Sequence, residues 1–166
     1  MIVTRLRPDH IDEVIQLMEL GRPYISARTR SDYWLYATLF STTCPVAIDG
    51  DGTIAGAVIA FRSQDSPADV YVQDVMIHPG YRRQGIAGAL LKSVQAQAEK
   101  WSCQRIYLTS EPANHAAHTA WTSLGFLNIA GDHTVEGVSV ITDYKGPGKS
   151  RAVYELPLPR SVVGNP

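Results

Sequence analysis

The stretch from Asp74 to Leu91 limits the fold of this chain more than any other part of the sequence. An apolar run ends at Ile77, a loop with several glycines follows, and apolar side chains then recur at helical spacing from Ile86. This pattern predicts a buried strand, a tight loop and an amphipathic helix. The first turn of such a helix offers unpaired backbone N–H groups and a partial positive charge, which stabilise an anion. Two arginines directly before the predicted helix indicate that this anion is a pyrophosphate.

Three phosphate-binding patterns compete for this loop. In a P-loop the second glycine is followed by Lys and Ser or Thr, but here Gly85 is followed by Ile86 and Ala87. A dinucleotide fingerprint needs Gly-x-Gly-x-x-Gly, and Gly85 and Gly88 supply only its second half. The remaining pattern, Arg82-x-x-Gly85-x-Ala87, resembles the Arg/Gln-x-x-Gly-x-Gly/Ala motif of the GCN5-related N-acetyltransferase (GNAT) family. The alternative is a glycine-rich helix start with solvated arginines.

A second resemblance to the same family lies downstream. The segment from Asn114 through Trp121 to Gly125 and Phe126 is similar to the Asn-x-x-Ala-x-x-x-Tyr…Gly-Phe segment of the family. It departs from that segment at one position, because Trp121 stands where most members carry a tyrosine whose hydroxyl faces the coenzyme sulfur.

The resemblance implies a mixed α/β fold of the GNAT type. Its central sheet is expected to be mostly antiparallel and flanked by helices, with two parallel strands, 70–77 and 105–109, that splay apart. Acetyl-coenzyme A is the implied co-substrate, its pantetheine arm lying in the gap between those strands. The residues that the resemblance assigns to the coenzyme are Val75, Met76, Ile77, Arg82, Arg83, Gln84, Gly85, Ile86, Ala87, Gly88, Asn114 and Trp121.

Periodicity and turn residues give the remaining elements. They are a strand at 2–6, a helix that begins near Pro8, a helix capped by Ser31 or Asp32, a hairpin over 46–61, a helix over 114–124 and a final strand at 151–156. Gly56, inside the second strand of the hairpin, marks a bulge or a close approach. Residues 128–150 follow no readable pattern. The length of 166 residues predicts one domain over 1–166.

Composition narrows the choice of partner and location. A formal net charge of -1 argues against a nucleic-acid-binding surface, and no apolar run is long enough to cross a membrane. Cys44 and Cys103 lie far apart without metal-ligand spacing, so we expect neither a disulfide nor a metal site. A cytoplasmic protein is the simplest interpretation. The resemblance leaves a homodimer as one option for assembly.

Direct attack of an amine on a thioester requires a neutral amine, a donor for the oxyanion and stabilisation of the leaving thiolate. Asp74 is the first candidate for the base, and Glu111, directly after the second parallel strand, is the next. The alternatives are that Asp74 is satisfied by neighbouring groups or only positions the ammonium, and that Glu111 is a helix-start charge. The indole of Trp121 is a donor that keeps its proton at biological pH. His118, three residues earlier, Tyr144 and water are therefore the candidates for protonating the thiolate.

The acceptor is expected to contact Trp34, Asp74, Glu111 and Tyr144. The aromatic residues around Trp34 have a simpler alternative role as part of the core. Four acidic residues, Asp74, Glu111, Glu136 and Asp143, indicate an acidic region suited to a cationic small molecule, such as an aminoglycoside-like or polyamine-like amine. The alternatives are acetylation of a protein or peptide amine, and an acyl-coenzyme A-binding module with little catalysis.

Overall fold

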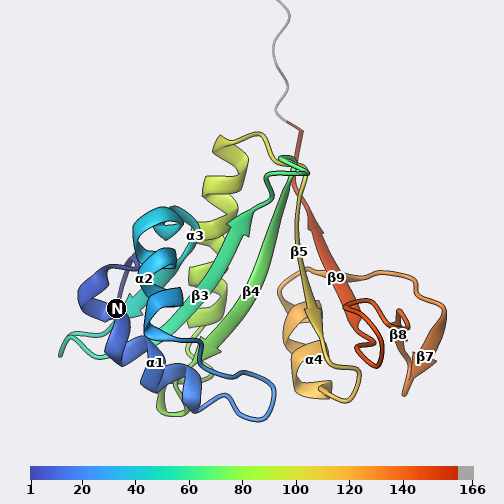
Figure 1. The fold of residues 1–166 in the computed structure, drawn as a ribbon, viewed down its shortest axis with the longest axis horizontal. Helices are drawn as coiled ribbons and strands as arrows, with labels where there is room; N and C mark the ends of the chain where they lie inside the picture. The colour runs from blue at the N-terminus through green and yellow to red at the C-terminus, as the bar shows by residue number, and fades with distance from the viewer. Residues whose placement is uncertain (161–166) are drawn as a thin grey trace, which may run out of the picture.

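A computed structural model describes residues 1–160 and contains four α-helices and nine strands in that range (Figure 1). The helices are α1 (Ile11–Glu19), α2 (Arg30–Leu39), α3 (Ile86–Lys100) and α4 (His115–Ser123), with 3-10 turns at Pro8–His10, Ser41–Thr43 and Pro79–Tyr81. The strands are β1 (Ile2–Arg5), β2 (Pro45–Ile48), β3 (Ile54–Arg62), β4 (Asp69–Ile77), β5 (Arg105–Ser110), β6 (Leu127–Asn128), β7 (His133–Val135), β8 (Val138–Val140) and β9 (Ala152–Pro157). In residues 1–160, no helix is both long and apolar enough to span a membrane.

Seven strands form one mixed sheet in the order β1-β2-β3-β4-β5-β9-β6, and β7 and β8 form a separate hairpin. All neighbours in the large sheet are antiparallel except β4 and β5, which are parallel. This arrangement confirms the fold expected from the sequence. The predicted order of elements is correct as far as α4. After α4 the chain forms four strands, and of these only the final one had been located in the sequence, at 151–156.

The two faces of the sheet carry separate apolar cores. One cluster includes Leu90 and Val94 of α3 together with Tyr154 of β9, and the other includes Val14 of α1 and Tyr33 of α2. Helix α2 begins at a capping box in which Thr29, and not Ser31, accepts the Asp32 backbone N–H. The predicted cap was therefore misplaced by two residues.

Both features expected near Gly56 are present. The pairing of β2 with β3 shifts next to it, and a Cβ on Gly56 would lie 2.7 Å from Ile77 Cδ1 and 3.2 Å from Ile86 Cγ2. Hydrogen in place of a side chain therefore lets β3 pack closely against β4 and the start of α3.

A bulge in β4 decides which way Asp74 points. Ile59 of β3 pairs with Asp74 and the next residue, Ala60, pairs with Val72, so Gln73 is an extra residue in β4. Val72 consequently packs with α3, whereas Met76 packs with α1 and α2. Asp74 shares the face of Met76. Regular alternation along β4 would place Val72, Asp74 and Met76 on one face, but the bulge reverses the alternation, so that Val72 lies on the opposite face.

Candidate active site

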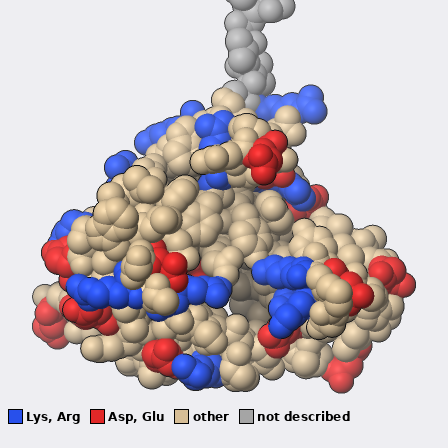
Figure 2. Space-filling model, in the orientation of Figure 1, with Lys and Arg blue, Asp and Glu red and all other residues tan. Residues whose placement is uncertain are grey.

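Strands β4 and β5 separate halfway along β4. They pair from Asp69 with Arg105 to Val72 with Leu108, and in the described part of the chain no strand continues along that edge of β4. Figure 1 shows the two strands adjacent at one end and apart at the other. The surface is hollowed over this region, with Lys and Arg side chains on both sides of the hollow (Figure 2). The backbone of Val75 to Ile77 thus has an unpaired edge, which is available to an extended ligand.

The N-terminus of α3 lies just after this free edge. Its cap residue, Gly85, has a left-handed φ of 75° and provides no side-chain hydrogen bond, and the first turn contains no acidic residue. A Cβ on Gly85 would meet no atom within 4 Å. Arg83 is also left-handed, with a φ of 64°, a conformation that is costly for a residue with a side chain. Uncapped N–H groups beside open space form a site for an anion.

The other residues assigned to the coenzyme in this region differ in their exposure. Arg82, Arg83 and Gln84 are exposed, so their side chains are accessible to a bound anion. Ile86 is buried in the core beside α3, where it anchors the start of the helix. The space beside Gly88 is filled differently, because a Cβ there would lie 3.4 Å from Leu124 at the end of α4. Gly88 therefore adjoins protein and not the open space next to Gly85.

Trp121 lies on α4, Asn114 directly precedes this helix, and α4 is linked to the end of β5. The Asn114 Oδ1 accepts the Ala117 backbone N–H at 3.1 Å, so this residue caps the helix. The Trp121 Nε1–H donates to Ser110 Oγ at 2.9 Å. Ser110 is the last residue of β5 and is 9% exposed. Ser110 was not predicted from the sequence. The only signal for it was Trp121, which replaces the tyrosine hydroxyl of the family motif and so requires another polar group near the coenzyme sulfur.

His118 contacts a residue of the sheet. Its Nδ1 lies 2.7 Å from the Tyr154 hydroxyl, which is buried in the core beside α3. Burial raises the pKa of Tyr154 to about 12, so the hydroxyl keeps its proton and can donate it to the imidazole. The structure therefore gives His118 a role in packing α4 against β9, whether or not it also takes part in catalysis.

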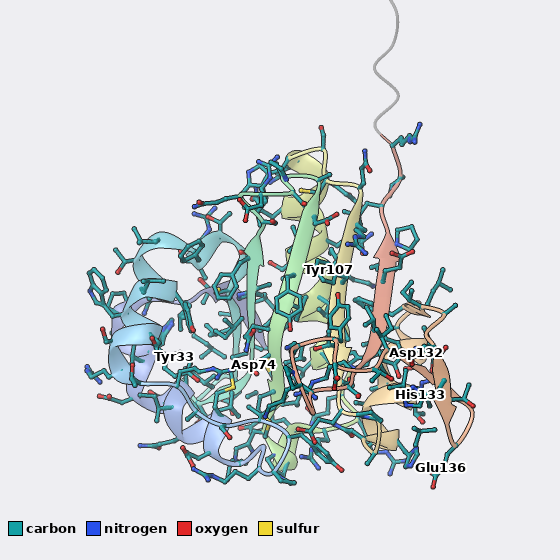
Figure 3. All side chains as sticks on the ribbon, turned by 45° about the vertical axis from the view of Figure 1, so that its right-hand side comes forward. Tyr33, Asp74, Tyr107, Asp132, His133 and Glu136 are labelled. Atoms are coloured by element: carbon teal, nitrogen blue, oxygen red, sulfur yellow. The ribbon has the colours of Figure 1, made fainter. Side chains whose placement is uncertain are left out.

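Asp74 is a buried carboxyl that has no hydrogen-bond partner among residues 1–160. It is 9% exposed, and no atom of the described residues pairs with its Oδ2. Burial raises the pKa of Asp74, and the nearby charges of Arg28 and Lys145 partly oppose this shift. In the view of Figure 3, Asp74 lies between Tyr33 on α2 and Tyr107 on β5. A satisfied structural aspartate would be paired, so this carboxyl is available to a ligand.

The segment after β8 covers the same face of the sheet. Lys145 Nζ donates to the Tyr71 hydroxyl at 2.7 Å, although 74 positions separate the two residues in sequence. Tyr144 is close enough to influence the pKa of Tyr107, which burial raises. The rings of Tyr71 and Tyr107 pack against each other at 5.1 Å on the adjacent strands β4 and β5. Of these residues only Tyr144 was predicted from the sequence; Lys145, Tyr71 and Tyr107 were not.

The expected acidic region is not assembled as a unit. Glu111 lines a cavity of about 440 Å³ together with Lys149 and Arg151. Glu136 forms an ion pair with His115, and Asp143 accepts a backbone N–H within its own turn. Trp34 remains half exposed on α2 and belongs to neither apolar cluster.

The fold and the free N–H groups at the start of α3 are those of the GNAT class of proteins. The sequence profile of the acetyltransferase (GNAT) family matches residues 12–126. The chain belongs to this family, which confirms the family indicated by the two sequence motifs.

Curated relatives align over part of the chain. An uncharacterised N-acetyltransferase from Mycobacterium bovis is 33% identical over 76 residues, which are 46% of this chain and 47% of that protein. An L-2,4-diaminobutyric acid acetyltransferase from Streptomyces avermitilis is 29% identical over 92 residues, 55% of this chain and 51% of that protein. The chain thus spans about half the length of the curated relatives it matches.

Solved structures resemble the whole fold. Naa20 from Chaetomium thermophilum, in complex with a bisubstrate analogue, superposes with a TM-score of 0.76 at 22% identity over 95% of this chain and 87% of that one. The diaminobutyrate acetyltransferase EctA from Paenibacillus lautus, with its substrate and coenzyme A, gives 0.74 at 21% identity over 94% and 93%. The ribosomal-protein-S18-alanine N-acetyltransferase from Escherichia coli gives 0.72 at 16% identity over 99% and 98%. At these identities the likeness establishes the fold.

Proposed function

We propose that this protein transfers the acetyl group of acetyl-coenzyme A to a primary amine of a small molecule by direct attack. The observation that carries the proposal is the position of Asp74, a buried carboxyl without a partner on the strand whose edge is free. An amine at that carboxyl would lie beside the thioester of a coenzyme held along β4. Family membership and the relatives that acetylate diaminobutyric acid support the same reaction.

The coenzyme would be held at two points. Its pyrophosphate would accept hydrogen bonds from the free N–H groups at the start of α3, and Arg82 and Arg83 would add charge-assisted hydrogen bonds. Its pantetheine arm would pair with the backbone of Val75 to Ile77 as an added strand. The backbone N–H of Met76 or a neighbour is our candidate donor for the oxyanion of the tetrahedral intermediate.

Asp74 would hold the ammonium and accept its proton, directly or through water, so that the neutral amine attacks the thioester carbon. The C–S bond then breaks and the coenzyme leaves as a thiolate. Because Trp121 keeps its proton, another group must stabilise this sulfur. We assign this role first to the Ser110 hydroxyl, because the Trp121 indole fixes its oxygen and leaves its hydrogen free to donate. His118 and water remain the alternatives.

Enclosure favours a small acceptor over a protein. The 141–151 segment crosses the face that carries Asp74, with Lys145 bonded to Tyr71 on β4. A peptide amine would need an open groove at this position. The structural likeness to the ribosomal-protein-S18-alanine N-acetyltransferase keeps a peptide acceptor as the second candidate.

Release of free thiol from acetyl-coenzyme A, measured across small amines and peptides, tests the proposal. Turnover with a small amine supports it, whereas turnover restricted to peptides favours the second candidate. Tight binding of coenzyme A without thiol release from any amine would indicate a coenzyme-binding module with little catalysis.

A further inference from the structure

Two positively charged side chains lie near Asp74, and they would repel an acceptor that carries several positive charges. Arg28, before α2, and Lys145, after β8, both lie close enough for their charges to lower the pKa of Asp74. Neither of them forms an ion pair with it in the described part of the chain. The Asp74 carboxyl therefore lies near two positive charges without forming an ion pair with either of them.

The Lys145 ammonium has N–H groups that are not used by its contact with Tyr71. Its Nζ donates to the Tyr71 hydroxyl at 2.7 Å and lies 5.3 Å from the centre of the Tyr71 ring. The Tyr71 hydroxyl is also 3.4 Å from Thr109 Oγ1 on β5, so the phenol is fixed from both strands. An ammonium has three N–H groups, and this contact uses one of them.

The bulge in β4 puts Tyr71 and Asp74 on one face. Tyr71 lies beside Tyr107, on the side opposite Val72, and the extra residue Gln73 brings Asp74 to that same side. Lys145 over Tyr71 therefore lies at one end of a short stretch of strand, and the unpartnered oxygen of Asp74 lies at the other.

The remaining acidic groups do not change this balance. Glu136 contacts His115, and Asp143 accepts a hydrogen bond from the Gly148 backbone N–H. Glu111 lines its cavity beside Lys149 and Arg151. A second ammonium next to Lys145 or Arg28 would be repelled, so a polyamine fits this site less well than a molecule with charges of both signs.

We infer that the acceptor is a zwitterion, with its reacting amine at Asp74 and an anionic group of the carboxylate class at Lys145. This inference rests on the proposed function and specifies its acceptor. The carboxylate of the acceptor would accept a charge-assisted hydrogen bond from Lys145 Nζ, and its ammonium would donate one to the unpartnered Oδ2 of Asp74. Both charges of the ligand would then be matched by charges of the site.

The test uses pairs of amines that differ only in a carboxylate: L-2,4-diaminobutyrate with 1,3-diaminopropane, L-lysine with cadaverine, and L-tyrosine with tyramine. In at least one pair, kcat/KM from thiol release should favour the amino acid by about 10- to 100-fold. In Lys145→Met this preference should fall to near one, and Lys145→Arg, which keeps the charge, should retain most of it. Lys92→Met on the exposed face of α3 is the matched control and should keep the full preference.

Failure of this inference can be distinguished from failure of the proposed function. Equal or better turnover of every decarboxylated amine by the unchanged protein would overturn the inference and leave the transferase assignment intact. If no compound releases thiol, the transferase assignment fails for this panel, and calorimetry with the coenzyme A complex still decides the inference. Tighter binding of an amino acid than of its partner, lost in Lys145→Met, supports it, and equal or absent binding across the three pairs overturns it.

Discussion

The indole N–H of Trp121 donates a hydrogen bond to the hydroxyl oxygen of Ser110 at 2.9 Å, linking α4 to the last residue of β5. The family motif places a tyrosine hydroxyl at position 121, and this chain has a donor there that cannot release a proton. The neighbouring Ser110 supplies a hydroxyl instead, at the point where β5 has already parted from β4. The pair is therefore our candidate for the group that stabilises the leaving thiolate.

Replacement of Ser110 by alanine should lower kcat by about 10- to 100-fold, because a hydrogen bond to a charged group is lost in the transition state. KM for acetyl-coenzyme A should change much less. Trp121→Phe, which removes only the bond that orients the hydroxyl, should cost less than about tenfold. Steady-state kinetics of thiol release give these values. A Ser110→Ala variant with an unchanged kcat would exclude Ser110 from the reaction.

Loss of the His118 side chain should first affect stability. His118→Ala leaves the buried Tyr154 hydroxyl without its partner at 2.7 Å, which costs about 1–3 kcal/mol in the free energy of unfolding. In the double variant His118→Ala/Tyr154→Phe the stability should largely return, and most of the turnover should persist. Thermal unfolding and kinetics on the same samples separate the two roles. Restored stability with a lost kcat would identify His118 as the acid.

Gly85, which caps α3, and Gly88, in its first turn, should respond differently to replacement by alanine. Gly85→Ala forces a left-handed conformation on a residue with a side chain and places a methyl group in the open space beside the helix start. We expect coenzyme A to bind at least about tenfold more weakly, since the anion loses close contact with the N–H groups. Isothermal titration measures this directly.

Gly88→Ala is the matched control for that experiment. The added methyl group would contact Leu124 at 3.4 Å, and alanine stabilises a helix interior by about 1 kcal/mol relative to glycine. Coenzyme binding should stay within about twofold of the unchanged protein by the same titration. A large loss would show that the coenzyme approaches the backbone at Gly88 as well.

Local patterns were sufficient to predict the helix start after the loop from Arg82 and the cap at Asn114, which we propose as the donor half of the site, because these features depend on neighbouring residues. The acceptor half depends on contacts between distant segments. The bond from Lys145 to Tyr71 joins residues 74 positions apart, through a segment whose turns require positive φ at Asp143 and Gly146. The bulge at Gln73 could not be predicted from the sequence either. Burial alternates regularly from Val70 to Met76, so the pattern of apolar residues does not reveal the extra residue.

Asp74→Asn should make the protein more stable and inactive. Burial raises the pKa of Asp74, so folding favours the protonated carboxyl. The stability that this carboxyl contributes is therefore present below its ordinary pKa of about 3.9 and is lost as the pH rises through the raised value. At pH 8 the neutral amide should raise Tm by about 2–4 °C, which corresponds to about 1 kcal/mol in a domain of this size.

The same variant should lose at least about 100-fold in kcat/KM, since the group that binds and deprotonates the amine is gone. The gain in Tm over the unchanged protein should shrink as the pH falls, because the carboxyl of the unchanged protein then becomes protonated and neutral as well. A Tm difference that is constant with pH would show that Asp74 is not a buried charge.

Lys145→Met should move the acidic limb of the pH dependence of kcat/KM to higher pH. Burial raises the pKa of Asp74, and the positive charges of Arg28 and Lys145 lower it by favouring the carboxylate. Removing the charge of Lys145 makes the carboxylate less favourable, so its pKa rises and more alkaline conditions are needed to deprotonate it. Lys92→Met, on α3, should leave the limb where it was. The measurement uses an amine without a carboxylate, so that only the protein titration changes. A shift toward lower pH, or an equal shift in both variants, would show that the charge of Lys145 does not act on the Asp74 carboxyl. The zwitterionic acceptor, which needs both groups in one site, would then lose its support.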